Sequence, residues 1–363
     1  MLTVAFDKFR HLDWILIAAV FLLFCLGLAT LYSVGLSQPE GVSNFHKQMV
    51  FGVIGFICLF IIGASTYSAW RVYSRWLYAV TLFLLVLVLF FGSTINGTKG
   101  WFQIGGLGIQ PVELAKISLL VFLAKFFSNR FQYFQPTKHL IVSLGLTFCF
   151  VFLIVLQPDL GSALVLVGIW LMLLILVGLP GRYWIGLMLV FIILATLGWT
   201  VFLHDYQKDR IMNFANPTRD PLGSGYNVTQ SIIAIGSGHW FGKGLGFGSQ
   251  SQLRFIPEAQ TDFLFAVIAE ELGLFGVAVV LALWLTVFYR LILIARRAAD
   301  DFGQLLVLGV ACLLFIHLIV NVGMNIGIMP VMGISLPFMS YGGSFVVVSL
   351  VLIGMAESVA VRR

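Results

Sequence analysis

The sequence predicts an all-α integral membrane protein: a ten-transmembrane-helix bundle with a large structured extracytoplasmic loop between helices 7 and 8. Of its 363 residues, 60% are hydrophobic and only 10% are charged, whereas soluble domains carry about 25% charged residues. Apolar runs of about 17–25 residues recur, the length that a helix needs to cross a bilayer. They do not alternate as barrel strands would, so helices are the expected spanning elements.

Ten apolar segments are expected to cross the membrane, and together they make residues 1–363 a single polytopic domain. Each is long enough to span and is separated from the next by a polar, glycine-containing or charged stretch. In chain order the expected spans are 14–35, 48–66, 76–93, 111–128, 139–157, 161–179, 183–203, 262–290, 303–326 and 341–361.

Basic residues predict the orientation. With an even number of spans, both termini lie on one side. If that side is cytoplasmic, the short outer loops hold only Lys47 and Lys99, as the positive-inside rule requires. The inner segments then hold Lys8, Arg10, Arg71, Arg75, Lys125, Arg130, Lys138, Arg182, Arg290, Arg296, Arg297, Arg362 and Arg363.

The long outer loop, residues 203–261, is predicted to be an ordered cap. It mixes aliphatic and aromatic residues with glycine, and long functional loops commonly have structure of their own. A short interfacial helix is expected near 227–236. Its basic residues beside glycine-rich backbone suit a phosphate or pyrophosphate. They are Lys208, Arg210, Arg219, Lys243 and Arg254.

Several other classes of function receive little support. The net charge of +6 is scattered over short loops, without the basic, aromatic face that nucleic-acid binding needs. The four cysteines, all in apolar spans, show no metal or redox spacing. No Ser/His/Asp order and no His-x-x-x-His pair appears, which argues against hydrolases and zinc enzymes. The cysteines are Cys25, Cys58, Cys149 and Cys312.

Ionisable residues at membrane depth are costly and are therefore candidates for function. Glu113 and Lys116 lie at i and i+3 on one helical face. They form either a mutually neutralising structural pair or part of a polar cavity where Lys116 meets an anion. Glu270 and Glu271 lie deeper in the eighth span and are expected to hydrogen-bond other helices.

Two aspartates lie at the outer mouths of spans. Asp159 precedes the sixth span and is placed to cap it. Asp262 stands where the eighth span begins, so capping and catalysis are both open for it. Thr261 could cap instead, which would leave the Asp262 carboxylate to face a cavity.

A polar stripe runs along the ninth span, where His317, Asn321 and Asn325 recur at i, i+4 and i+8. Such stripes commonly join membrane helices to one another; the wall of a solvated groove is the alternative. Two further outer segments, 94–111 and 333–344, are polar and rich in glycine. They are expected to converge with the long loop on one cavity.

These residues resemble the SEDS family (shape, elongation, division and sporulation), and within it the elongation branch more than the division branch. The resemblance covers nearly the whole chain. Gln260 and Arg254 depart from the usual pattern of the family. The motifs that carry it are Lys99-Gly100-Trp101, Gln110-Pro111 through Lys116, Gln157-Pro158-Asp159-Leu160-Gly161, Pro257-Glu258 with Thr261-Asp262-Phe263, Glu270-Glu271-Leu272-Gly273, Ser340-Tyr341-Gly342-Gly343-Ser344, Asp205 through Ile211 and Gly248 through Leu253.

The resemblance implies a peptidoglycan glycosyltransferase of the bacterial cytoplasmic (inner) membrane that polymerises lipid II, an undecaprenyl-pyrophosphate disaccharide peptide, for elongation and rod shape. It implies Asp262 as general base on the acceptor hydroxyl. Arg210 and Lys116, with Lys99 and Lys243 behind them, are the candidates for the pyrophosphate, and Glu113 and Asp159 for the cavity wall. A class B penicillin-binding protein and other elongation-complex membrane proteins are the implied partners. No dedicated metal cluster is visible, which leaves a divalent cation (Mg²⁺ or Mn²⁺) open.

The main alternative is a lipid II flippase without polymerase activity, since buried Glu113, Lys116 and Asp159 also suit a transport path. No inverted repeat with broken helices, as many transporters have, is evident in the sequence. A purely structural scaffold would leave the outer Asp and Arg residues unexplained.

Overall fold

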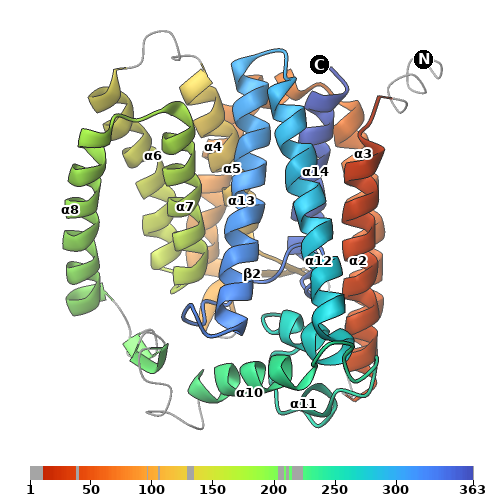
Figure 1. Ribbon diagram of the computed structural model, residues 1–363. Coiled ribbons are helices and arrows are strands. Elements are labelled where there is room, and N and C mark those ends of the chain that lie inside the picture. The colour runs from red at the N-terminus through yellow and green to blue at the C-terminus, as the bar shows by residue number, and fades with distance from the viewer. Residues whose placement is uncertain are drawn as a thin grey trace.

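The computed structural model describes residues 11–37, 41–95, 97–104, 107–128, 135–202, 208–209, 212–214 and 224–362. Within them, ten helices of 17 residues or more form an upright bundle (Figure 1). They are α2 (Trp14–Gly35), α3 (Gly41–Ala64), α4 (Tyr67–Phe91), α5 (Pro111–Ser128), α6 (Pro136–Val155), α7 (Leu160–Val177), α8 (Gly181–Leu197), α12 (Leu264–Arg296), α13 (Asp301–Asn325) and α14 (Gly343–Ala360).

Smaller elements complete the described fold. Strands β1 (Ser93–Ile95), β2 (Thr98–Ile104) and β3 (Leu107–Ile109) form an antiparallel sheet between α4 and α5, with Thr94 paired to Lys99. A π-helical turn, η2 (Gly198–Phe202), continues α8. Helices α10 (Ser224–Ser237) and α11 (Ser249–Gln252) lie across one end of the bundle, called here the loop end (Figure 1).

Nine of the ten long helices are apolar enough to cross a membrane. The tenth, α5, carries Glu113, Lys116 and Lys125 within its 18 residues. It lies inside the bundle against α4, α7 and α13, and most of its residues are buried. The ten predicted spans are therefore confirmed as ten helices, and α10 confirms the short helix expected near 227–236.

Two predicted boundaries are wrong by about two helical turns. The third span was expected to begin at residue 76, but α4 begins at Tyr67. Arg71 belongs to this helix, and its guanidinium lies 3.5 Å from the Asp300 carboxylate. A long basic side chain can extend to the polar end of the bundle while its backbone stays helical, so the charged residue does not mark the start of the span. The second span was expected at residue 48, but α3 begins at Gly41.

Helix α8 lies apart from the rest of the bundle (Figure 1). None of its residues is buried, and apolar side chains such as Ile185, Met188 and Phe191 are more than half exposed. In a bilayer, this apolar surface faces lipid.

Helix α12 is broken at Gly273, whose φ of 66° and ψ of −166° are not helical. That backbone region is accessible almost only to glycine. Residues 239–244 pack into the break and satisfy the backbone groups on both sides of it. The hydrogen bonds are Lys243 N to Glu270 O, Gly244 N to Glu271 O, Leu274 N to His239 O and Phe275 N to Trp240 O, at 2.9–3.0 Å.

Gly273→Ala is expected to destabilise the protein. A Cβ at this position would lie 2.3 Å from Gly242 N, and the backbone strain alone costs about 1–3 kcal/mol. The thermal midpoint of the purified protein in detergent measures the effect. Gly145→Ala is the control, because nothing lies within 4 Å of a Cβ at Gly145. Equal midpoints for the two variants would show that the break tolerates a side chain.

Candidate active site at the start of helix α12

Asp262 lies directly before helix α12, and that helix begins at the loop end (Figure 1). Its side chain is partly buried, and a Cβ added to Gly333 would lie 3.8 Å from Asp262 Oδ2. The chain turns tightly here, since Phe263 N donates to Glu258 O at 3.1 Å. The N-cap residue of α12 is Phe263, one residue after Asp262, and it forms no side-chain capping bond.

Thr261 does not cap α12, so that expectation is wrong. Its hydroxyl donates to Glu258 Oε2 at 2.9 Å instead. The cap comes from another helix: Ala266 N donates to Asn325 Oδ1 at 3.1 Å. Ala266 is the third residue after the N-cap, the position whose amide a capping side chain normally satisfies.

The polar stripe on α13 joins helices, as one of the two readings of the sequence predicted. Asn321 Nδ2 donates to Asp262 O at 3.0 Å and to Ile334 O at 2.8 Å. Asn325 Nδ2 also donates to Asp262 O, at 2.9 Å. The stripe thus holds the main chain of Asp262, a target that the spacing of the stripe could not reveal.

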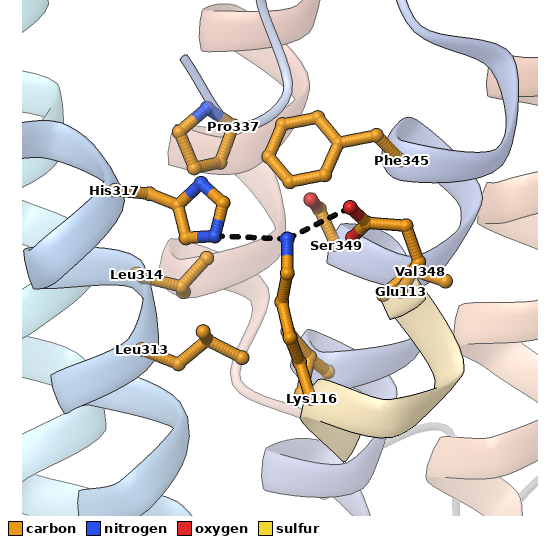
Figure 2. A pocket seen from close by; sticks show the side chains of 10 residues that line it. Glu113, Lys116, Leu313, Leu314, His317, Pro337, Phe345, Val348 and Ser349 are labelled. Atoms are coloured by element: carbon orange, nitrogen blue, oxygen red, sulfur yellow. Dashed lines mark hydrogen bonds and ion pairs between the residues drawn. The ribbon is translucent and has the colours of Figure 1, made fainter. Parts of the chain in front are cut away.

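Glu113 and Lys116 form a buried ion pair (Figure 2). Lys116 Nζ lies 2.7 Å from Glu113 Oε1 and 3.4 Å from His317 Nε2. The Phe345 ring covers this group, 5.4 Å from Lys116 Nζ to its centroid. The neutralising pair is therefore confirmed.

A small cavity adjoins the pair, lined by Glu113, Lys116, His317, Pro337 and Phe345 among others (Figure 2). Its volume is about 10 Å³, which is room for about one water molecule. Glu113 Oε2 is buried and has no hydrogen-bond partner among the described residues. The cavity therefore has room for one water molecule. The predicted role of Glu113 and Lys116 in substrate binding stays a prediction.

The segment 332–335 lies beside Asp262, His317 and the start of α7. Gly161, two residues after Asp159, packs on Met332 O, and Gly333 adjoins Asp262. His317, which contacts Lys116, also lies 3.4 Å from Ser335 O through its Nδ1. Segment 333–344 does contact the C-terminal edge of the long loop, where Tyr341 N donates to Gln260 O at 2.8 Å; the single cavity expected between the outer segments stays a prediction.

Asp159 caps α7, as predicted, since its Oδ1 accepts from Ser162 N at 3.0 Å. Its other oxygen accepts from Gln110 Nε2 at 3.4 Å. Lys99 is part of strand β2. The next residue of that strand, Gly100, packs against the side chain of Gln157. The 94–111 segment and the start of α7 thus meet.

Lys243 neutralises a buried carboxylate. Its ammonium lies 3.0 Å from Glu270 Oε1, and Glu270 also accepts from Gln250 N and Ser251 N. Glu271 accepts from Ser33 Oγ on α2 at 2.6 Å. Both glutamates therefore bind other elements, as expected. Arg210 lies outside the described residues.

Two polar side chains of α3 were missed by the sequence reasoning. Gln48 donates to Ser340 O at 2.9 Å and accepts from Gly342 N at 3.2 Å, and Asn44 donates to Gln260 Oε1 at 2.8 Å. A polar first turn ahead of an apolar span was the available signal. Burial raises the pKa of the neighbouring Tyr341 hydroxyl, because it disfavours the charged phenolate.

The described residues contain no group of three or more His, Cys, Asp or Glu that could hold a metal ion. A divalent cation held by one or two carboxylates together with substrate oxygens, as is usual for Mg²⁺, stays a prediction.

Comparisons with known proteins agree with the motifs. The FtsW/RodA/SpoVE family of cell cycle proteins matches residues 13–363. The peptidoglycan glycosyltransferase MrdB of Escherichia coli K12 is 37% identical over 354 residues, 97% of this chain and 94% of the relative. Stage V sporulation protein E of Bacillus subtilis is 35% identical over 356 residues, 96% of each chain.

Solved structures share the fold. A chain of a peptidoglycan synthase complex that coordinates polymerization and crosslinking has a TM-score of 0.79 and 32% identity, over 96% of this chain and 97% of that one. The rod shape determining protein RodA of Thermus thermophilus has a TM-score of 0.72 and 30% identity, over 96% of both chains. The chain belongs to the FtsW/RodA/SpoVE family.

Proposed function

We propose that this chain is a peptidoglycan glycosyltransferase that polymerises lipid II into glycan strands for cell-wall elongation. Relatives that match nearly its whole length carry that activity in their names. The observation that carries the assignment to a site is the placement of Asp262, a partly buried carboxylate beside Gly333 and directly before α12. Its main chain is held by two asparagines of α13.

The reaction is an inverting displacement. The donor sugar of lipid II is α-linked to pyrophosphate, and the product bond is β-1,4, so one displacement at the anomeric carbon inverts it. The acceptor 4-hydroxyl oxygen forms the new bond, its proton passes to the Asp262 carboxylate, and the bond to the pyrophosphate oxygen breaks. A base within reach of the transferred proton contributes about 10²–10⁴-fold.

The leaving pyrophosphate needs positive charge in a site of low dielectric constant. Arg210 and Lys116 are the proposed groups, with Lys99 and Lys243 behind them. Lys116 and Lys243 each already form an ion pair with a buried glutamate, so either would bind the pyrophosphate in addition to that carboxylate. Glu113 and Asp159 are proposed to shape the polar wall. The described residues provide no metal cluster, so a divalent cation would rest mainly on the oxygens of the substrate's pyrophosphate.

We place the loop end outside the bacterial inner membrane and both termini in the cytoplasm. Basic residues gather at the helix ends that lie away from the loop end, and positive charge beside a span is retained in the cytoplasm. These residues are Arg71, Arg75, Arg296, Arg297 and Arg362. The exposed apolar face of α8 is proposed to lie beside the undecaprenyl chain. The related synthase complex supports a class B penicillin-binding protein as the partner.

Purified protein in vesicles with labelled lipid II tests the proposal. Polymer formation, resolved on gels, is the expected result, with and without the penicillin-binding partner. Translocation of lipid II across the vesicle membrane without any polymer would overturn the proposal in favour of a flippase. A divalent-cation titration of the same reaction separates a requirement for Mg²⁺ or Mn²⁺ from none.

A further inference from the structure

Three consecutive backbone carbonyls directly before α12 accept hydrogen bonds from elsewhere in the chain. The donors come from α13 and from the loop that precedes α14, and three of them are side chains. Tyr341 N donates to Gln260 O at 2.8 Å, Ser340 Oγ to Thr261 O at 2.6 Å, and Asn321 Nδ2 and Asn325 Nδ2 to Asp262 O at 3.0 Å and 2.9 Å.

The three donating side chains are themselves fixed. Asn321, Asn325 and Ser340 are fully buried, each at 0% exposure. Each makes a second bond: Asn321 to Ile334 O at 2.8 Å, Asn325 from Ala266 N at 3.1 Å, and Ser340 from Leu336 N at 3.0 Å. A buried amide with its donors and acceptor used is held in one orientation, because any other would leave polar atoms unpaired.

We propose that Asn321, Asn325 and Ser340 are positioning residues for Asp262. This inference rests on the proposed function, in which the Asp262 carboxylate is the general base. The three side chains hold the main chain of residues 261–262, so the carboxylate is presented to the acceptor hydroxyl without reorganisation. Proton transfer needs heavy atoms about 2.6–3.2 Å apart, and a displacement of about 1 Å can cost about 10²-fold in rate.

The competing explanation is that the stripe only joins membrane helices, as such stripes commonly do. The two explanations differ in what a substitution changes. Loss of a joining bond lowers stability and substrate binding together with the rate. Loss of positioning lowers kcat while KM and lipid II affinity stay near wild type.

Full-length Asn321→Leu, Asn325→Leu and the double variant, assayed with purified lipid II, test the proposal. Each single variant leaves one bond to Asp262 O, so kcat is expected to fall about tenfold, and about 10²-fold in the double variant. KM and the equilibrium affinity for lipid II are expected within about twofold of wild type. Asn321→Gln, which keeps the amide donor, is expected to recover part of the lost rate.

Thr147→Val is the matched control. Thr147 is buried in α6 and donates to its own helix at Ser143 O, 2.9 Å away, so its loss removes a buried hydroxyl remote from Asp262. The asparagine variants are expected to lose more thermal stability than this control, because each leaves buried backbone groups unpaired, but to keep their affinity for lipid II near wild type. A fall in lipid II affinity that parallels the fall in kcat would overturn the positioning role.

Ser340→Ala keeps the inference testable if the double variant does not fold. It removes one hydroxyl, and kcat is expected to fall about three- to tenfold at unchanged KM; unchanged kcat would count against the inference. Asp262→Asn separates the two proposals. Normal polymerisation by Asp262→Asn removes the general-base role itself, whereas an impaired Asp262→Asn beside fully active asparagine and serine variants removes only the positioning role.

Discussion

Asp262→Asn is expected to lower kcat for glycan polymerisation by about 10²–10⁴-fold, the range that a positioned general base contributes. Asparagine has the shape of aspartate but cannot take the proton of the acceptor hydroxyl. The side chains of Asn321 and Asn325 donate to the backbone carbonyl of Asp262, and the substitution leaves that carbonyl in place. Polymer yield over time from purified protein and lipid II measures the effect.

Asp301→Asn is the control for that prediction. It makes the same chemical change in the first turn of α13, at the opposite end of that helix from Asn325, and is expected to polymerise lipid II as wild type does. Lipid II binding by the Asp262→Asn variant is expected to stay near wild type. A polymerisation rate equal to that of the control would show that another group takes the proton.

Glu113→Ala is expected to destabilise the protein by about 3–5 kcal/mol, the cost of breaking a buried ion pair from one side. Lys116 is only 3% exposed, and its ammonium would lose the carboxylate at 2.7 Å. The cavity beside it, of about 10 Å³, is too small to hydrate a full charge. Thermal or denaturant unfolding in detergent measures the change.

The double variant Glu113→Ala, Lys116→Met is the control for the pair. It removes both charges, so most of the stability lost in Glu113→Ala is expected to return. Unchanged stability in Glu113→Ala would mean that the Lys116 charge is solvated, and the pair would then line a water-filled site instead of a dry contact between α5 and α13.

The fold was largely predictable because the bilayer imposes a length and a composition on each helix. Apolar runs located ten helices. The boundaries failed where polar residues belong to a helix: Arg71 lies within α4, and Asn44 and Lys47 lie in the first turns of α3. Three-residue strands such as β1 and β3 leave too short a pattern to be recognised.

The candidate site was predictable in its residue types but not in its contacts. The spacing of His317, Asn321 and Asn325 gave a polar face on α13, yet its targets at Asp262 and Ile334 depend on how α12 and the following loop pack. The break at Gly273 depends in the same way on residues 239–244, which lie far ahead of it in the chain. Periodicity describes one element at a time and is silent on such pairings.

Single-turnover transfer from lipid II tests the general-base role of Asp262 most directly, because it isolates formation of the glycosidic bond from substrate binding and product release. With enzyme in excess and substrate fully bound, wild-type protein is expected to form the first β-1,4 bond rapidly. Asp262→Asn is expected to form it about 10²–10⁴-fold more slowly. Equal single-turnover rates for the two proteins would contradict the assignment of Asp262 as the base.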